Sequence, residues 1–370
     1  MAFEAQLEAL KTRGQYRHLR EVETVLQQRI YKDGKEWLNF TSNDYLGLGQ
    51  RPLDVNQLQA YGEKYASHLA SSRLVSGNSA LYTKLEQQMG EALGYEAALI
   101  MASGYDANLA VFQIFKRQDV VIFSDALNHA SIIDGIHLSR VKKVIFPHRD
   151  YDMLKKEMAK YPNATKVIVT DTVFSTNGHL VNLDAIRRLK MEFDNTIIVV
   201  DDSHGFGLGY DMSYDDIDVV TTSLSKGLGA HGGLILCSKV IKDMLVNMAR
   251  PLIYSNCMPT MNLYLIEQQF EALEEAQNER ERLHHNIQEF NHYFGSSCGA
   301  STAIKAIEVK NNKQANDVYE ALLTEGIWVS LFRYPTVEKP TLRMSLSSWH
   351  KSKDIQKLIH MLQKGGVGGV

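Results

Sequence analysis

The sequence predicts an α/β protein with a mostly parallel sheet of seven strands, followed by a smaller C-terminal α+β domain. Between residues 97 and 237, short apolar stretches alternate with amphipathic helical stretches. Uniformly apolar strands that alternate with helices are typical of a parallel sheet that helices cover on both faces. After about residue 300 the pattern changes to short strands and helices in mixed order, which indicates a second domain.

The predicted strands of the sheet are short and uniformly apolar. They span residues 97–102, 120–123, 143–146, 167–170, 196–201, 218–222 and 234–237, and helices are predicted over 106–115, 131–139, 151–160 and 183–193. In the C-terminal part, strands are predicted over 304–309, 327–332 and 342–346, and helices over 314–323 and 353–363. We therefore expect a large α/β domain over residues 41–270 and a smaller α+β domain over residues 271–370.

Residues 1–40 are expected to form a helical and hairpin segment. Apolar residues recur at helical spacing up to about residue 30, which predicts one or two polar helices. Asp33-Gly34 then lies between two short apolar stretches and predicts a tight hairpin turn. Arg13, Arg17 and Arg20 share one helical face, which is either a solvated surface or a basic rim over an anionic substrate.

Composition and charge exclude several classes of function. The chain of 370 residues has a net charge of -3, so it lacks the basic footprint of a nucleic-acid-binding protein. No apolar stretch approaches the roughly 18 residues that cross a membrane, and the N-terminus has no signal-peptide pattern. Cys237, Cys257 and Cys298 are isolated and predict neither a disulfide framework nor a metal site. The expected compartment is the cytoplasm.

A lysine between hydroxyl residues and glycines follows the sixth predicted strand. Residues 221–233 read TTSLSKGLGAHGG, with the lysine at position 226. Small residues let the backbone approach a ring or a phosphate, and a lysine amine of lowered pKa can form a Schiff base. Lys226 is therefore a candidate pyridoxal phosphate lysine, although glycine-rich loops have other uses. The stretch also matches G-x-G-x-x-G, but a dinucleotide fingerprint opens a helix and residues 234–237 predict a strand, so we reject that interpretation.

Polar residues gather where the predicted strands end, which is where parallel sheets bind ligands. Residues 103–105 (SGY) precede a helix, so they form either an ordinary turn or an anion site at its N-terminus. Residues 201–205 (DDSHG) end the fifth strand. Buried carboxylates there need partners, and a pyridinium nitrogen would satisfy one of them without a metal. His129, in a third turn, is either structural or part of the same site.

The chain resembles the α-oxoamine synthases, which are pyridoxal phosphate enzymes of the aspartate aminotransferase fold (fold type I). The resemblance covers nearly the whole chain and rests on several motifs in one order. These motifs are SNDYLGL at 42–48, LNHAS at 127–131, VFS at 173–175, DDSHG at 201–205, SKG at 225–227 and LRMSL at 342–346.

The resemblance implies how the ring of pyridoxal 5'-phosphate is held. Lys226 would form the Schiff base and later serve as the base that takes the α-proton. Asp201 would pair with the pyridine nitrogen, and His129 would stack on the ring. His204 and Ser175 would bond the ring hydroxyl.

The resemblance also implies a phosphate site and a shared active site. Ser103 and the backbone N–H groups of Gly104 and Tyr105 would hold the phosphate together with the hydroxyl of Ser223. Ser255 would reach the cofactor of a neighbouring subunit, which implies a homodimer with shared active sites.

For the substrates, the resemblance implies an amino acid and an acyl thioester that is carried by coenzyme A or by a carrier protein. Arg343, which the residues alone leave as an ion-pair partner or a carboxylate clamp, would bind the amino acid carboxylate. Asn43 would line the site, and Arg17 is the candidate ligand of an anionic substrate. The implied reaction is a decarboxylative condensation through a quinonoid intermediate.

Two substrate pairs remain open within the family. They are L-alanine with a pimeloyl thioester, as in biotin synthesis, and glycine with an acetyl thioester. Residues 75–77, 253–255 and 335–337 favour the first pair. A cofactor-binding but inactive partner subunit is the alternative from a different class. One departure is the stretch after His204, where residues 208–218 form a shorter loop without the arginine that relatives carry, which puts details of thioester binding and subunit contacts in doubt.

Overall fold

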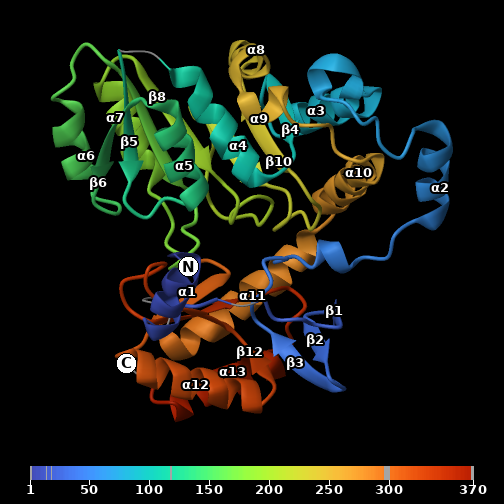
Figure 1. Ribbon diagram of the computed structural model, residues 1–370, viewed down its shortest axis with the longest axis vertical. Coiled ribbons are helices and arrows are strands. Elements are labelled where there is room, and N and C mark those ends of the chain that lie inside the picture. The colour runs from blue at the N-terminus through green and yellow to red at the C-terminus, as the bar shows by residue number, and fades with distance from the viewer. Residues whose placement is uncertain (1, 14, 18, 117–118, 296–300, 368–370) are drawn as a thin grey trace. The chain divides into compact units, whose positions relative to one another are not determined.

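The computed structural model describes the chain except for residues 1, 14, 18, 117–118, 296–300 and 368–370, so Cys298 lies outside the described residues (Figure 1). The chain divides into two compact units. The large unit holds Leu46–Ser175 and His179–Arg280, and the small unit holds Met1–Tyr45, Thr176–Gly178 and Glu281–Val370. Within the described ranges, no helix is long and apolar enough to cross a membrane.

The large unit is built on a seven-stranded sheet in the order β4-β10-β9-β8-β7-β5-β6 (Figure 1). The strands are β4 (Ala97–Met101), β5 (Val120–Asp125), β6 (Lys142–Phe146), β7 (Thr165–Asp171), β8 (Thr196–Asp201), β9 (Val219–Ser223) and β10 (Gly233–Cys237). All pairings from β9 to β6 are parallel, and β10 runs antiparallel to both of its neighbours. The mostly parallel sheet that the sequence predicts is confirmed.

Helices cover both faces of this sheet because the chain moves towards one edge from β5 to β6 and towards the other edge from β6 through β7 to β8. Right-handed crossovers in opposite directions lie on opposite faces. One face carries α4 (Gly104–Val111), the 3-10 turn Phe112–Phe115, α5 (Ala130–Ser139), α8 (Lys239–Met248) and α9 (Arg250–Ile253), and the other carries α6 (Tyr151–Met158) and α7 (Leu183–Glu192) (Figure 1). Alternate strand residues such as Leu99, Ile122 and Val167 pack against α4 and α5 in one apolar core. Burial on both faces explains why the central strands β5, β7 and β8 are mainly apolar.

The remaining elements of the large unit surround the edge strand β4. They are the 3-10 turn Leu48–Gln50, α2 (Val55–Lys64), the π turn Arg73–Gly77, α3 (Ala80–Ala92) and α10 (Thr260–Glu274), and α11 (Gln277–Phe294) begins at the end of this unit. Helix α3 packs against β4 and α10. The buried Glu86 on α3 pairs with Arg73 at 2.7 Å and with Lys242 at 2.8 Å, so this carboxylate joins three elements.

The small unit contains two sheets. One has the order β1 (Thr24–Leu26), β2 (Arg29–Lys32), β3 (Lys35–Asn39), β12 (Ile327–Trp328), and the other has the order β11 (Ile304–Glu308), β14 (Thr341–Ser345), β13 (Ser330–Phe332). Helices α1 (Ala2–Thr12), α12 (Asn312–Thr324) and α13 (Ser352–Lys364) belong to the same unit as most of α11. The predicted hairpin is confirmed, since β2 and β3 are antiparallel and Gly34 has a φ of 69° at the turn.

Two expectations for the small unit are corrected. The helical pattern was expected to continue to about residue 30, but Thr24–Leu26 is a strand that pairs antiparallel with β2. The β-branched Thr24 and Val25 favour this extended form once a partner strand is present. The single strand expected over residues 327–332 is two strands, because Ile327 pairs with Leu38 in one sheet and Ser330 with Arg343 in the other.

Candidate active site

Lys226 lies in the loop between β9 and β10, with its Nζ 3.0 Å from Nε2 of His204. The glycines of this loop provide clearance for the backbone. A Cβ on Gly227 would lie 2.2 Å from the carbonyl oxygen of Phe206, so the lysine loop packs directly on the turn that carries His204. Gly229 has a φ of +70°, a left-handed conformation that favours glycine. The loop therefore presents the lysine amine to a histidine from the neighbouring strand end.

Asp201 ends β8 with 3% of its surface exposed, and fixed donors hold both of its carboxylate oxygens. Oδ2 accepts a hydrogen bond from Nδ2 of Asn108 at 2.6 Å, and Oδ1 accepts one from the backbone N–H of Ser203 at 2.9 Å. Oδ1 of Asn108 in turn accepts from the hydroxyl of Thr221 at 2.7 Å. The carboxylate is thereby oriented from α4 and β9 as well as from its own strand end.

His129 is the N-cap residue of α5, and its ring lies close to Asp201 and Lys226. Nδ1 is 2.7 Å from the hydroxyl of Ser131, and the backbone N–H of His129 donates to Asp171 Oδ2 at 2.8 Å. Burial lowers the pKa of His129; Asp201 opposes this shift and Lys226 adds to it. The imidazole is therefore mainly neutral at pH 7.

Asp171 and Asp201, the last residues of β7 and β8, lie in register with each other and with Thr221 in the middle of β9. Asp171 is fully buried, and desolvation raises the pKa of its carboxyl well above the usual range, with the charge of Asp201 adding to the shift. One row of neighbouring residues thus holds two acids and a hydroxyl, and Asn108 joins Asp201 to the hydroxyl of Thr221.

The N-terminus of α4 lies against Ser223, the last residue of β9. Ser103 caps this helix, and its hydroxyl accepts from the N–H of Asp106 at 3.0 Å. A Cβ on Gly104 would lie 2.8 Å from the Cβ of Ser223, so glycine is what permits this approach. The N–H groups of Gly104 and Tyr105 in the first turn have no acceptor within the helix, and the helix dipole favours an anion there.

These groups fit pyridoxal phosphate. Glycine at position 104 brings the N-terminus of α4, which favours an anion, next to Ser223, and an amine, a carboxylate and an imidazole lie at the same edge of the sheet. In the part of the chain that the structure describes, Lys226 would bind the cofactor, Asp201 would face its ring nitrogen and His129 would cover its ring.

The other predicted cofactor residues are Ser175, Tyr105 and Ser255. Ser175 follows β7 in the loop where the N–H of Phe174 donates to the carbonyl of His179 at 3.0 Å. The Tyr105 side chain is 42% exposed and bonds Asp134 on α5, which leaves only its backbone N–H for an anion. Ser255 is exposed in the loop after α9. The roles of Ser175 and Ser255 stay predictions.

Asn43 and Arg343 contact each other in the small unit. Arg343 is 4% exposed, and its Nη2 donates to Oδ1 of Asn43 at 3.1 Å while Nη1 donates to the Ser345 hydroxyl at 2.8 Å. The buried hydroxyl of Tyr45 donates to the same Asn43 oxygen at 3.1 Å. Arg17 is exposed and donates to Thr336 at 3.3 Å, so its role as a substrate ligand also stays a prediction.

The residue that sequence reasoning missed is Asn108. None of the motifs above includes it, yet its side chain bonds Asp201, Thr221 and the hydroxyl of Ser131. Its position could have indicated a role, because Asn108 is a polar residue on the apolar face of α4, where its neighbours Ala107 and Val111 are fully buried. A buried amide must find hydrogen-bond partners, which marks such a position as part of a polar network.

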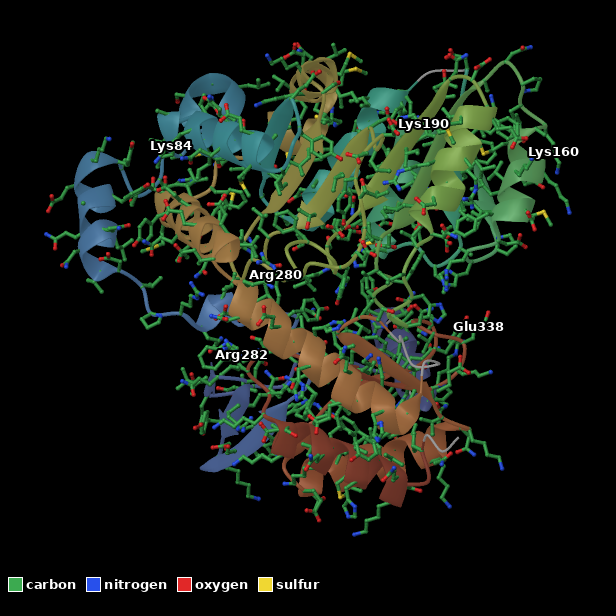
Figure 2. All side chains as sticks on the ribbon, turned by 180° about the vertical axis from the view of Figure 1, so that it is seen from behind. Lys84, Lys160, Lys190, Arg280, Arg282 and Glu338 are labelled. Carbon is green, nitrogen blue, oxygen red and sulfur yellow. The ribbon has the colours of Figure 1, made fainter. Side chains whose placement is uncertain are left out.

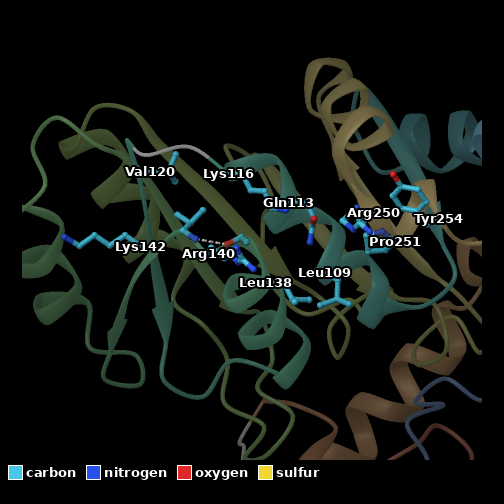
Figure 3. Close-up of a pocket in the computed structure, with 12 residues that line it drawn as sticks. Leu109, Gln113, Lys116, Val120, Leu138, Arg140, Lys142, Arg250, Pro251 and Tyr254 are labelled. Atoms are coloured by element: carbon cyan, nitrogen blue, oxygen red, sulfur yellow. Dashed lines mark hydrogen bonds between the residues drawn. The ribbon is translucent and has the colours of Figure 1, made fainter.

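A groove lies elsewhere, on the helical face of the large unit (Figure 3). This groove of about 970 Å³ is lined by Leu109, Gln113, Lys116, Val120, Leu138, Ser139, Arg140, Val141, Lys142, Arg250, Pro251 and Tyr254. Val120 and Lys142 begin β5 and β6, so the groove reaches the amino ends of these strands. Because parallel sheets bind ligands at the carboxyl ends of their strands, we place the chemistry at the Lys226 edge.

Comparisons with known proteins are consistent with this site. Residues 35–362 match the model of the family "Aminotransferase class I and II". The 8-amino-7-oxononanoate synthase of Hydrogenovibrio crunogenus is 35% identical over 349 residues, which cover 89% of this chain and 87% of that protein.

Two solved structures share the fold. A serine palmitoyltransferase from S. paucimobilis, solved with a bound PLP–myriocin aldimine, has a TM-score of 0.90 at 23% identity over 99% of this chain and 96% of that one. An 8-amino-7-oxononanoate synthase from Francisella tularensis has a TM-score of 0.76 at 28% identity over 88% of this chain and 96% of that one. The chain therefore belongs to the class I and II aminotransferase family and, within it, to the α-oxoamine synthases, which are pyridoxal phosphate-dependent acyltransferases of fold type I.

Proposed function

We propose that this enzyme condenses L-alanine with a pimeloyl thioester, releasing CO2 and the free thiol, to form 8-amino-7-oxononanoate in biotin synthesis. The observation that carries the proposal is the contact of Lys226 Nζ with His204 at 3.0 Å, next to a carboxylate that Asn108 and Ser203 orient. The choice of substrates is supported by relatives of that name at 35% and 28% identity over most of the chain.

Pyridoxal phosphate, when bound, supplies an electron sink for the negative charge left when the amino acid loses its α-proton. We propose that Lys226 holds the cofactor covalently and that its freed amine removes and returns that proton. His204 Nε2, at 3.0 Å, orients the Lys226 amine. Asp201 keeps a proton on the ring nitrogen, and the oxygens of Asp201 are already fixed for that contact.

On the substrate side, we propose that Arg343 binds the amino acid carboxylate. Its guanidinium is held in one orientation by Asn43 and Ser345, and a fixed fork of N–H donors suits bidentate carboxylate recognition. The buried Tyr45 hydroxyl orients Asn43 from the other side. The acyl thioester is carried by coenzyme A or by a carrier protein, and such thioesters are intracellular metabolites, which supports the cytoplasm as the proposed compartment.

We also propose a homodimer in which Ser255 of each subunit completes the active site of the other. Support comes from the exposure of the loop after α9, where Tyr254 is 71% exposed and Ser255 is exposed next to it. An exposed large aromatic side chain beside a groove is typical of residues that become covered in an assembly.

An assay of two substrate pairs tests the proposed function. The holoenzyme is incubated with L-alanine and pimeloyl thioester, with coenzyme A or carrier protein as the thiol, and separately with glycine and acetyl-coenzyme A. We expect free thiol and CO2 in equal amounts from the first pair and much less from the second. A preference for glycine with acetyl-coenzyme A would instead assign a glycine C-acetyltransferase, and pyruvate without thiol release would indicate a transaminase.

A lysine substitution tests the proposed cofactor attachment. Lys226→Ala should remove the visible absorbance of the covalently held cofactor and abolish turnover, because no other amine in the loop can replace it. Lys160→Ala, an exposed lysine on the far side of the same unit (Figure 2), is the matched control and should keep both. Retention of the absorbance in Lys226→Ala would refute the assignment.

A further inference from the structure

Asp202 is a buried carboxyl that the proposed chemistry does not use. It lies directly after β8 and is 3% exposed. Its backbone N–H donates to the carbonyl of Thr221 on β9 at 2.7 Å, and its carbonyl accepts from Gly205 at 3.1 Å and from Phe206 at 2.8 Å. Asp202 therefore joins the strand that leads into the lysine loop to the turn that carries His204.

The side chain of Asp202 connects that turn to two further segments. Oδ1 accepts from the hydroxyl of Thr172, just after β7, and the hydroxyl of Tyr214, in the loop before β9, bonds the same carboxyl. A Cβ on Gly205 would lie 2.3 Å from Asp202 Oδ1, so the backbone of the turn packs directly on this carboxyl. The carboxyl thus fills the inside of the turn.

The Asp202 carboxyl borders a cavity of about 260 Å³ whose lining includes Phe206, Phe270 and Leu273. The shortened loop after His204 forms part of the wall of this cavity, through residues between 207 and 214.

Charged and titratable groups face Asp202 from several elements. Asp201 lies beside it on β8, Lys226 lies in the lysine loop, Tyr95 precedes β4, and Glu274 and Arg280 line the same cavity (Figure 2 labels Arg280). Arg280 donates to the carbonyls of Gly207 at 2.8 Å and Leu273 at 2.7 Å. Burial raises the pKa of Asp202 to about 7, and the charge of Asp201 adds to the shift while the two hydroxyls and Lys226 oppose it.

We propose that Asp202 is a positioning residue for the Lys226–His204 pair, whose carboxyl fixes the 202–206 turn between Thr172 and Tyr214. The inference rests on the proposed function, because it assumes that this pair holds the cofactor. The carboxyl accepts from both hydroxyls, and its raised pKa reduces the second negative charge beside Asp201. Loss of the carboxyl would let His204 move relative to Lys226.

Two substitutions separate positioning from simple packing. Asp202→Asn keeps the shape and an acceptor oxygen, whereas Asp202→Ala removes both. We expect kcat to fall about tenfold or more in Asp202→Ala with KM changed less than about twofold, because small misplacements of reacting groups act on the chemical step. Asp202→Asn should remain within about twofold of the wild type. Asp211→Asn, an exposed acid in the same loop, is the control and should change neither.

A second measurement is the pH titration of the visible absorbance of the cofactor on Lys226. A residue that only stabilised the fold would not change its midpoint. We expect Asp202→Ala to shift the midpoint of that titration, and Asp202→Asn and Asp211→Asn to keep it. An unshifted midpoint with unchanged kcat in Asp202→Ala overturns the proposal, and so does an Asp202→Asn variant as impaired as Asp202→Ala. If Asp202→Ala does not fold, Tyr214→Phe carries the test, with a smaller shift in the same direction expected and no shift refuting the role.

The titration distinguishes this proposal from the proposed function. The absorbance midpoint does not depend on which amino acid or thioester is used, so a shift in Asp202→Ala supports positioning even where the alanine and pimeloyl assay is negative. A wild-type protein that binds no cofactor at Lys226 overturns both.

Discussion

At the scale of single residues, Asn108 organises the site more than any group that the motifs suggested. Its amide joins the carboxylate of Asp201 on β8 to the hydroxyls of Thr221 on β9 and Ser131 on α5. Ser131 is in turn 2.7 Å from Nδ1 of His129. One side chain therefore sets the relative positions of the acid and the imidazole that are proposed to contact the cofactor ring.

Replacing Asn108 with leucine should leave its hydrogen-bond partners unpaired and destabilise the folded chain. We expect Asn108→Leu to lower the free energy of unfolding by about 1–3 kcal/mol, the usual cost of an unpaired buried polar group, and to weaken retention of the cofactor. Denaturant titration and spectroscopic titration with pyridoxal phosphate measure the two effects. Asn247→Leu on α8, where the amide is exposed, is the control. An Asn108→Leu protein as stable as that control would contradict the network.

The carboxyl of Asp202 predicts a pH dependence of stability. Its pKa is about 7 in the folded chain and about 3.9 when unfolded, so between these values the folded state binds more protons. Stability must then fall as pH rises from about 4 towards 8. Denaturant unfolding at pH 5 and pH 8 should show a smaller loss in Asp202→Asn than in the wild type. Equal losses in the two proteins would show that Asp202 is ionised throughout.

At the scale of elements, helix α4 contributes both its N-terminus and a face to the site. Its first turn approaches Ser223 at the end of β9 only because residue 104 has no side chain. Its second turn carries Asn108 beneath the row of strand ends. The close packing of α4 on the sheet therefore determines two parts of the site at once.

Gly104→Ala should push the first turn of α4 away from the end of β9. The new Cβ would lie 2.8 Å from Ser223 Cβ, and overpacking of this kind costs about 1–3 kcal/mol. We expect weaker binding of pyridoxal phosphate, measured by absorbance titration, and lower stability. Gly62→Ala in α2 is a matched control with open space around it, and it should stabilise the chain by about 0.5–1 kcal/mol. Unchanged cofactor affinity in Gly104→Ala would contradict an anion-binding site at the N-terminus of α4.

At the scale of the whole molecule, the proposed homodimer makes each active site depend on two chains. Lys226→Ala and Ser255→Glu should each be inactive alone, the first for lack of the amine and the second because its carboxylate repels the phosphate. Random mixed dimers contain one intact site, so an equal mixture should recover about a quarter of wild-type activity. Recovery is measured after co-expression. A mixture as inactive as its components would show that Ser255 does not act across subunits.

The strands and the hairpin were predictable because their signals are local. Burial on both faces requires continuous apolar runs such as residues 167–170, and Asp33-Gly34 suits only a few tight turns. The residues around Lys226, Asp201 and His129 could also be named, because parallel strands bring their carboxyl ends to one edge. Their assigned roles remain predictions that the experiments above test.

What the sequence determined by itself is thus the α/β class, the parallel sheet and the edge at which its polar residues gather. Only the tertiary structure decided that residues 24–26 form a strand, that the run 327–332 divides between two sheets, that Asn108 bonds Asp201 and that Asp202 bonds Thr172. The reason is the range of the forces involved. Apolar periodicity acts on neighbours along the chain, whereas a strand partner or a buried hydrogen bond comes from residues far away in sequence, and no local pattern specifies which ones.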